Sequence, residues 1–167
     1  MARKRARFDP YGLLAALERQ AVSYIVIGGF ARVIHGTGEL TRGLDIVPST
    51  RPENLRRLSE AFAELGARAD AREAAALTER LPTVLAVTTD RGLLQVVPAP
   101  LGTRGYDDLR RRATREPLGR GLRPSVAAPE DLARMLSALD RERDAPALHR
   151  IRRVMAFERQ LGHGLEL

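Results

Sequence analysis

The stretch YIVIGGFARVIHGTGELTRGLDIV, residues 24–47, decides the fold of this chain. It opens with a short apolar and β-branched run over residues 24–27, which predicts a buried strand. Gly28 and Gly29 follow, and this pair predicts a tight turn at the end of the strand. A short helix is then expected over about residues 30–35.

The same stretch ends in a second apolar run, residues 44–47, which predicts another strand that stops at Pro48. Asp45 lies within this run. An acidic side chain in an apolar strand is costly unless it faces a cleft or a partner. Asp45 is therefore the first candidate for a functional residue.

The flanking sequence supplies the remaining elements. Helical periodicity and capping signals predict helices, and the Thr-Asp-Arg-Gly sequence at residues 89–92 predicts the turn of a β-hairpin. Both hairpin strands carry apolar residues on both faces, which predicts a central place in the sheet. The expected helices are residues 10–20, 51–65, 106–115, 129 onward and 144–159, and the hairpin strands are residues 84–88 and 93–97.

This order of elements predicts an α+β fold, with a small mixed β-sheet flanked by helices and with further helices at the C-terminal end. We expect residues 1–167 to form a single domain. Within it, residues 1–8 would form a basic N-terminal tail and residues 129–160 a helical part.

The composition limits the classes of function. Hydrophobic residues make up 44% of the 167 residues and charged residues 29%, as in an ordinary soluble domain. No apolar run approaches the roughly 20 residues of a membrane-spanning helix, so no membrane partner is expected. The chain has no cysteine, which excludes disulfides, thiolate metal sites and a cysteine nucleophile, and a cytoplasmic location is expected.

The formal net charge of +7 leaves two interpretations open. A basic surface attracts nucleic acid or the phosphates of a nucleotide. The simpler interpretation is a solvated basic surface, because all but one of the 28 basic residues are arginines, as a high-GC genome would favour. Aromatic residues make up only 4% of the chain, so a base-stacking platform for single-stranded nucleic acid is not supported.

The stretch that begins at Ile27 resembles the minimal nucleotidyltransferases, in the branch that contains the AbiEii and MenT-type toxins. The shared pattern is a Gly-Gly turn, a helix, His-Gly, a Thr, and an Asp at the start of a strand. Residues 92–97, 106–109 and 129–135 look like later parts of the same family. The resemblance implies a nucleotidyltransferase fold over roughly residues 20–150.

The resemblance also implies where the chemistry would take place. In the family, two Asp separated by one residue lie on one face of a strand, because side chains alternate along a strand with a period of two. With a third carboxylate on a neighbouring strand, they hold Mg²⁺ on the triphosphate of a nucleotide. Gly28, Gly29, Thr41 and Arg42 are the residues implied to bind the nucleotide.

This sequence departs from the family at the polar positions. Counted from Thr41, the first carboxylate position holds Gly43 and the second holds Asp45. The third position holds Gln95, which is neutral and cannot act as a base. Glu39 replaces an Arg of the family and is a carboxylate that could substitute beside Asp45. Asp45 alone is expected to bind a metal ion only weakly.

Three hypotheses follow. The leading one is a pseudoenzyme: a nucleotidyltransferase-fold protein with lost or reduced metal-dependent transfer, which binds a nucleotide, RNA or a protein partner and needs no cofactor when free. The second is an active enzyme that uses Mg²⁺ or Mn²⁺ to transfer a nucleoside monophosphate from an NTP to tRNA, protein or a small acceptor. The third is a toxin–antitoxin component that acts through protein contacts. The spatial relation of Glu39, Asp45 and Gln95 separates the first two.

Overall fold

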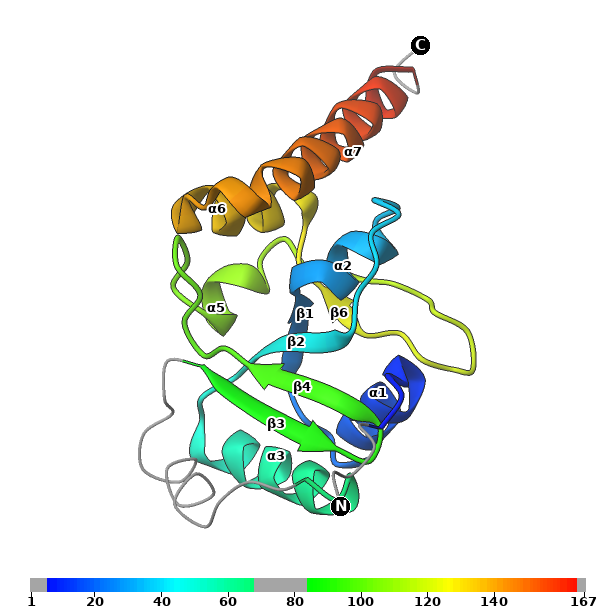
Figure 1. The fold of residues 1–167 in the computed structure, drawn as a ribbon, viewed down its shortest axis with the longest axis vertical. Helices are drawn as coiled ribbons and strands as arrows, with labels where there is room; N and C mark the ends of the chain where they lie inside the picture. Colours follow the sequence, from blue (N-terminus) through cyan, green and yellow to red (C-terminus); the bar gives the residue numbers. More distant parts are fainter. Residues whose placement is uncertain (1–5, 68–83, 165–167) are drawn as a thin grey trace.

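The computed structural model describes residues 6–67 and 84–164. A six-stranded mixed sheet, with strand order β3-β4-β2-β1-β6-β5, is flanked by helices (Figure 1). This arrangement confirms the expected α+β fold. The helices are α1 (Pro10–Arg19), α2 (Gly28–Ile34), α3 (Pro52–Glu64), α5 (Tyr106–Leu109), α6 (Pro129–Leu139), the 3₁₀ turn η1 (Glu142–Asp144) and α7 (Ala145–Gly164), and the strands are β1 (Tyr24–Ile27), β2 (Gly43–Pro48), β3 (Leu85–Thr89), β4 (Gly92–Val96), β5 (Thr114–Arg115) and β6 (Ser125–Val126).

Strand β2 lies in the middle of the sheet, antiparallel to β1 and parallel to β4. Its side chains alternate between two faces. Leu44 and Ile46 are completely buried and belong to the hydrophobic core, together with Leu94 and Val96 of β4. The opposite face of the same two strands carries polar side chains, as described below for the candidate site.

The β-hairpin of β3 and β4 forms as expected, but it lies at one edge of the sheet and not in its centre. Burial alternates along β3, where Leu85 and Val87 are buried and Ala86 and Thr88 are exposed. The apolar residues on both faces were therefore a poor indicator of a central position. Only one face of this edge strand is covered by the core.

The helix expected over residues 106–115 was predicted wrongly. The helix α5 ends at Leu109, its one buried residue, instead of near residue 115. A helix without an apolar stripe gains little from tertiary packing, so short helices of this kind do not extend. Residues 114–115 and 125–126 instead pair as β5 and β6, which are too short for sequence periodicity to reveal.

The C-terminal helices were predicted correctly. Helix α6 packs against α7, and the second half of α7 projects away from the rest of the molecule (Figure 1). Ile151 is completely buried, whereas Phe157 and Leu161 on the projecting half are exposed. In residues 6–67 and 84–164, no helix combines the length and apolar character that crossing a membrane requires.

Asn54 ties helix α3 to the central strands. Its side chain is buried and accepts a hydrogen bond from the Ser23 N–H at 2.7 Å. Its amide nitrogen also donates to the carbonyl oxygens of Ser23 at 2.9 Å and Ser49 at 2.8 Å. One side chain thus satisfies backbone groups just before β1 and just after β2.

We expect Asn54→Ala to lower the free energy of unfolding by about 2–4 kcal/mol, because it leaves buried backbone groups without partners. Urea denaturation followed by circular dichroism measures this loss. Arg56→Ala, on the exposed side of the same helix, is the control and should change the stability by less than about 0.5 kcal/mol. Equal effects of the two substitutions would show that Asn54 has no such role.

Candidate functional site

A cavity of about 350 Å³ opens between the polar face of β2 and β4 and the helices α2 and α6. We call it the Asp45 cavity. Its polar and glycine lining comes from the sheet, from α2 and from the segment after α6: Gly28, Gly29, Arg32, Asp45, Gln95, Arg141 and Asp144. Its apolar lining is Ile27, Val84, Val97, Ala99, Pro100, Leu101, Leu132, Met135, Leu136 and Leu139.

Asp45 and Gln95 are direct neighbours on the parallel strands β2 and β4. Both side chains line the Asp45 cavity. This confirms the prediction that the two strands are adjacent and that these residues point into one cleft. Gly43, two residues before Asp45, is paired with Leu93, so the first carboxylate position of the family lies on the same face without a side chain.

Gly28 is the residue that makes room for Asp45. Its φ angle is +70°, in the region that favours glycine, and a Cβ built on it would lie 2.3 Å from the Asp45 Oδ2 atom. The Gly-Gly pair that was expected to form a turn instead forms the first two residues of α2. The helix therefore begins two residues earlier than predicted. At Gly29, by contrast, a Cβ would meet its nearest neighbour, Thr41 Oγ1, at an ordinary 3.4 Å.

Burial raises the pKa of the Asp45 carboxyl, and the nearby Arg32 guanidinium opposes this shift. The net shift is upward, which means that Arg32 does not fully compensate for the loss of water around the carboxylate. The ionised carboxylate of Asp45 in the wall of the cavity therefore lowers the free energy of unfolding.

Arg32 lies between two acidic residues. Its Nε atom donates to both carboxylate oxygens of Glu39, at 2.9 and 3.2 Å. The Thr37 hydroxyl donates to the same carboxylate at 2.7 Å. Burial alone would raise the pKa of Glu39, but these hydrogen bonds hold it below its usual value.

The structure therefore does not place Glu39 beside Asp45. Glu39 is bound to Arg32 and Thr37, and it is not part of the lining of the Asp45 cavity. Thr41 and Arg42 are not in this lining either. Thr41 donates to the Gly43 carbonyl at 3.0 Å and so shapes the start of β2, while Arg42 is exposed to solvent.

Three charged residues of the cavity were not singled out from the sequence: Arg32, Arg141 and Asp144. Arg32 is one of many arginines, and nothing in the sequence marks it. Arg141 and Asp144 are bonded to each other, Nε to Oδ2, in the segment that links α6 to α7. Leu132, Met135 and Leu139 recur at helical spacing along α6 and form a wall of the cavity.

His35, within the stretch that resembles the family, has a structural contact. Its Nε2 atom lies 2.9 Å from the Ala127 carbonyl oxygen, which links the end of α2 to the segment between β6 and α6. It does not line the Asp45 cavity.

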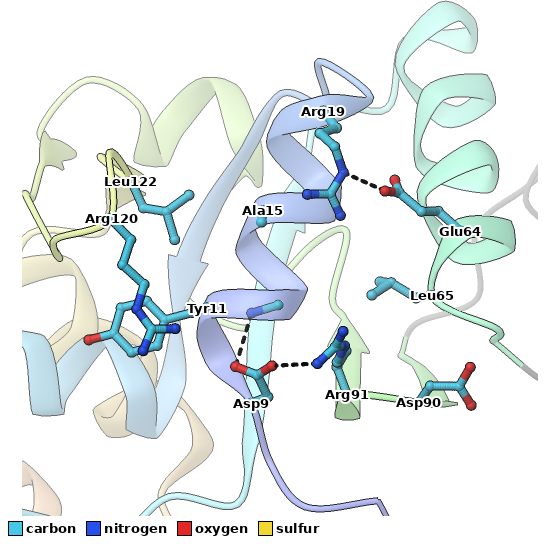
Figure 2. A pocket seen from close by; sticks show the side chains of 11 residues that line it. Asp9, Tyr11, Ala15, Arg19, Glu64, Leu65, Asp90, Arg91, Arg120 and Leu122 are labelled. Carbon is cyan, nitrogen blue, oxygen red and sulfur yellow. Dashed lines mark hydrogen bonds and ion pairs between the residues drawn. The ribbon is translucent and has the colours of Figure 1, made fainter.

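A second cavity, of about 470 Å³, lies beside α1 and is also lined by the end of α3 and by the turn between β3 and β4 (Figure 2). Arg91 pairs with Asp9 at 3.2 Å, Arg19 pairs with Glu64, and the Arg120 guanidinium lies 4.4 Å from the centre of the Tyr11 ring. Asp9 also caps α1 by accepting from the Gly12 N–H at 3.0 Å. These contacts join α1 to its neighbours, so we place the candidate site in the smaller Asp45 cavity.

The donor set of the Asp45 cavity fits a divalent metal ion poorly. Across the described residues, no three His, Cys, Asp or Glu side chains gather closely enough to hold a metal ion. On the sheet itself, Asp45 supplies one charged ligand and Gln95 a neutral one. Without the phosphates of a substrate, a hard cation such as Mg²⁺ would have to take most of its oxygen ligands from water here.

Two solved structures share the architecture of this chain. The crystal structure of the lincosamide antibiotic adenylyltransferase LnuA with bound lincomycin has a TM-score of 0.61 and 14% sequence identity, and the match covers 89% of this chain and 99% of that one. The solution structure of the antibiotic-resistance factor ANT(2'')-Ia has a TM-score of 0.54 and 15% identity, with 93% of this chain and 92% of that one covered. No model of a protein family matches the sequence, and no curated protein matches it either. At these identities the likeness concerns the fold, and the chain has a nucleotidyltransferase fold.

Proposed function

We propose that this protein binds a nucleotide in the Asp45 cavity and has lost, or greatly reduced, metal-dependent nucleotidyl transfer. The observation that supports this proposal is the pairing of β2 with β4. It puts Asp45 beside Gln95, and position 43 on the same face is a glycine. This face therefore offers one carboxylate where the minimal nucleotidyltransferases have three.

The loss of two carboxylates weakens metal-dependent transfer more than it weakens the binding of a nucleotide. Mg²⁺ in phosphoryl-transfer sites uses one or two carboxylates together with the phosphates of the substrate. Asp45 could still touch an ion that a nucleotide carries, but the sheet supplies no acidic ligand for a second one. Loss of even one electrostatic contact to the transition state commonly lowers a rate about 100-fold or more.

The cavity suits a small molecule better than a macromolecule. Its volume of about 350 Å³ lies in the range of small-ligand sites. Three exposed apolar side chains, Val84, Leu101 and Leu139, all lie on its rim or wall. Such a surface can cover the flat face of a base while the polar floor meets the phosphates, which favours a nucleotide over RNA or a protein partner.

An active nucleotidyltransferase is the second candidate, and Asp144 favours it. This carboxylate lines the Asp45 cavity from η1, opposite the sheet. It is engaged by Arg141, and it would have to leave that partner to act on an acceptor hydroxyl or on a metal ion. Transfer of a labelled nucleoside monophosphate in the presence of Mg²⁺ or Mn²⁺, with total RNA and with the protein alone, would establish this candidate.

The main test of nucleotide binding is calorimetric titration with ATP in EDTA. We expect binding without a metal ion that weakens strongly between 0.1 and 1 M salt, because the Debye length falls from about 10 Å to about 3 Å over this range. Binding that requires Mg²⁺ and disappears in Asp45→Ala would favour the active enzyme instead. Absence of binding under both conditions would contradict the proposed function.

Restoring the missing carboxylates tests the account of the metal site. Gly43→Asp combined with Gln95→Asp should raise the affinity for Mn²⁺ about tenfold or more, since hard ions prefer charged oxygen ligands. The new Cβ at position 43 would lie 3.1 Å from the Leu93 carbonyl oxygen, so β4 must shift by a few tenths of an ångström. Gly43→Asn with Gln95→Asn has nearly the same shape without the charge and serves as the control. Tight Mn²⁺ binding by the unmodified protein would refute this account.

Asp45→Asn should make the protein more stable at pH 7, by more than the roughly 0.5 kcal/mol of a neutral surface substitution. Because burial raises the pKa of Asp45, the charged form costs stability above that pKa and the protonated form does not. The gain should therefore shrink as the pH falls and vanish below the ordinary pKa of an aspartate, about 4. Urea denaturation at several pH values measures it, with the exposed Asp107→Asn as control. A loss of stability at pH 7 would contradict this account.

A further inference from the structure

Arg32 is the less exposed of the two arginines that line the Asp45 cavity. Its side chain is only 14% exposed, and its Nε atom is bonded to Glu39. In the part of the chain that the structure describes, neither of its Nη atoms donates to a protein acceptor. These atoms are not fully buried, and Arg32 lines the cavity, so their N–H groups are available to a ligand there.

Glu39 holds the guanidinium of Arg32 in its orientation through the Nε atom. Glu39 receives two hydrogen bonds from Nε and is itself held by the Thr37 hydroxyl at 2.7 Å. One Nη atom lies 3.6 Å from the point where a Cβ of Gly29 would stand, so the guanidinium lies close to the Gly28-Gly29 backbone. A guanidinium held in this way loses little further conformational freedom when it binds an anion.

The other nearby cations are less suited to the same task. Arg141 also lines the cavity, and its Nε atom is likewise engaged by a carboxylate, that of Asp144, but its side chain is 39% exposed. Arg42, which the resemblance suggested, is exposed and is not part of the lining. Of the guanidinium groups that line the cavity among the described residues, that of Arg32 is the less exposed.

We propose that Arg32 is the phosphate-binding residue of the Asp45 cavity, and that its two Nη atoms hold a phosphate group of the nucleotide without a metal ion. A planar guanidinium donates two parallel hydrogen bonds to phosphate oxygens, and these charge-assisted bonds are about twice as strong as neutral ones. Glu39 and Thr37 are positioning residues for Arg32. This inference rests on the proposed function and names the group through which that function would operate.

Asp45 is compatible with this role. A carboxylate next to bound phosphate repels it, and three carboxylates would do so far more strongly in the absence of a metal ion. On this face of the sheet, two of the three positions are the uncharged Gly43 and Gln95, and the other carboxylate that lines the cavity, Asp144, is bonded to Arg141. Asp45 is close enough to Arg32 for the guanidinium to oppose the upward shift of its pKa.

The experiment compares three ligands in EDTA by calorimetry: ATP, inorganic tripolyphosphate and adenosine. Arg32→Met keeps the length of the side chain and removes the guanidinium. We expect it to weaken the binding of ATP and tripolyphosphate about 10- to 100-fold, as the loss of a charge-assisted pair would, and to leave adenosine binding unchanged. Arg56→Met on the exposed surface of α3 removes the same charge and should change each affinity less than about threefold.

The outcomes separate this inference from the proposed function. Unchanged ATP and tripolyphosphate binding by Arg32→Met, or an equal loss in Arg56→Met, would overturn the role of Arg32 while leaving nucleotide binding in place. Failure of the unmodified protein to bind any of the three ligands would overturn both. If adenosine binding also falls in Arg32→Met, the Arg32→Lys variant distinguishes a lost phosphate contact from a general disturbance of the cavity. Recovery of adenosine affinity without full phosphate affinity supports the guanidinium contact, and recovery of both overturns it.

Discussion

The parallel pairing of β2 with β4 is the interaction on which the candidate site depends. It places Leu44 beside Leu94 and Asp45 beside Gln95, so that one face of the two strands is core and the other lines a cavity. A shift of one residue would turn Asp45 into the core and expose Leu44. The apolar face therefore fixes the position of the polar face, and the site keeps its geometry even where its chemistry has changed.

The second constraint is the close approach of the Asp45 carboxylate to Gly28. Only a glycine fits there, because any Cβ would collide with the carboxylate oxygen and because φ is positive. The carboxylate is thus enclosed by backbone on one side, and the positive charge of Arg32 stabilises its ionised form. Arg32 is in turn bound to Glu39. The charges thus alternate in sign along Asp45, Arg32 and Glu39, with one guanidinium for two carboxylates.

Much of this fold could be predicted from the sequence because its signals are local. The apolar runs of β1 and β2 and the turn sequence of the β3–β4 hairpin each depend on a few neighbouring residues, and the strands and the hairpin predicted from them formed. The pairing of Asp45 with Gln95 followed from the resemblance together with the period of two along a strand. Here the same residues that build the core also determine which side chains reach the cavity.

The residues that were missed depend on contacts between distant segments. Arg32 is indistinguishable in sequence from many other arginines, and its importance comes from the loop that brings Glu39 to its Nε atom. Likewise, the expected replacement of a lost ligand by Glu39 assumed that nearness in sequence to Asp45 meant nearness in space. The actual partner of Glu39 lies on α2, seven residues earlier in the chain. Ion-pair choice of this kind is set by tertiary structure, not by a local pattern.

The replaced carboxylates and the available guanidinium act in the same direction on the charge of the cavity. A cavity that gathers several carboxylates attracts divalent ions, and it repels phosphate until those ions are bound. In the proposed role, a sheet face with one carboxylate beside a held guanidinium attracts phosphate directly and has little attraction for a free metal ion. Each carboxylate added at position 43 or 95 would compete with phosphate for Arg32, so metal affinity and metal-free phosphate affinity should change in opposite directions. With Gln95 and Arg32 in the lining and Gly43 on the same face of the sheet, our proposal is that the balance favours the phosphate.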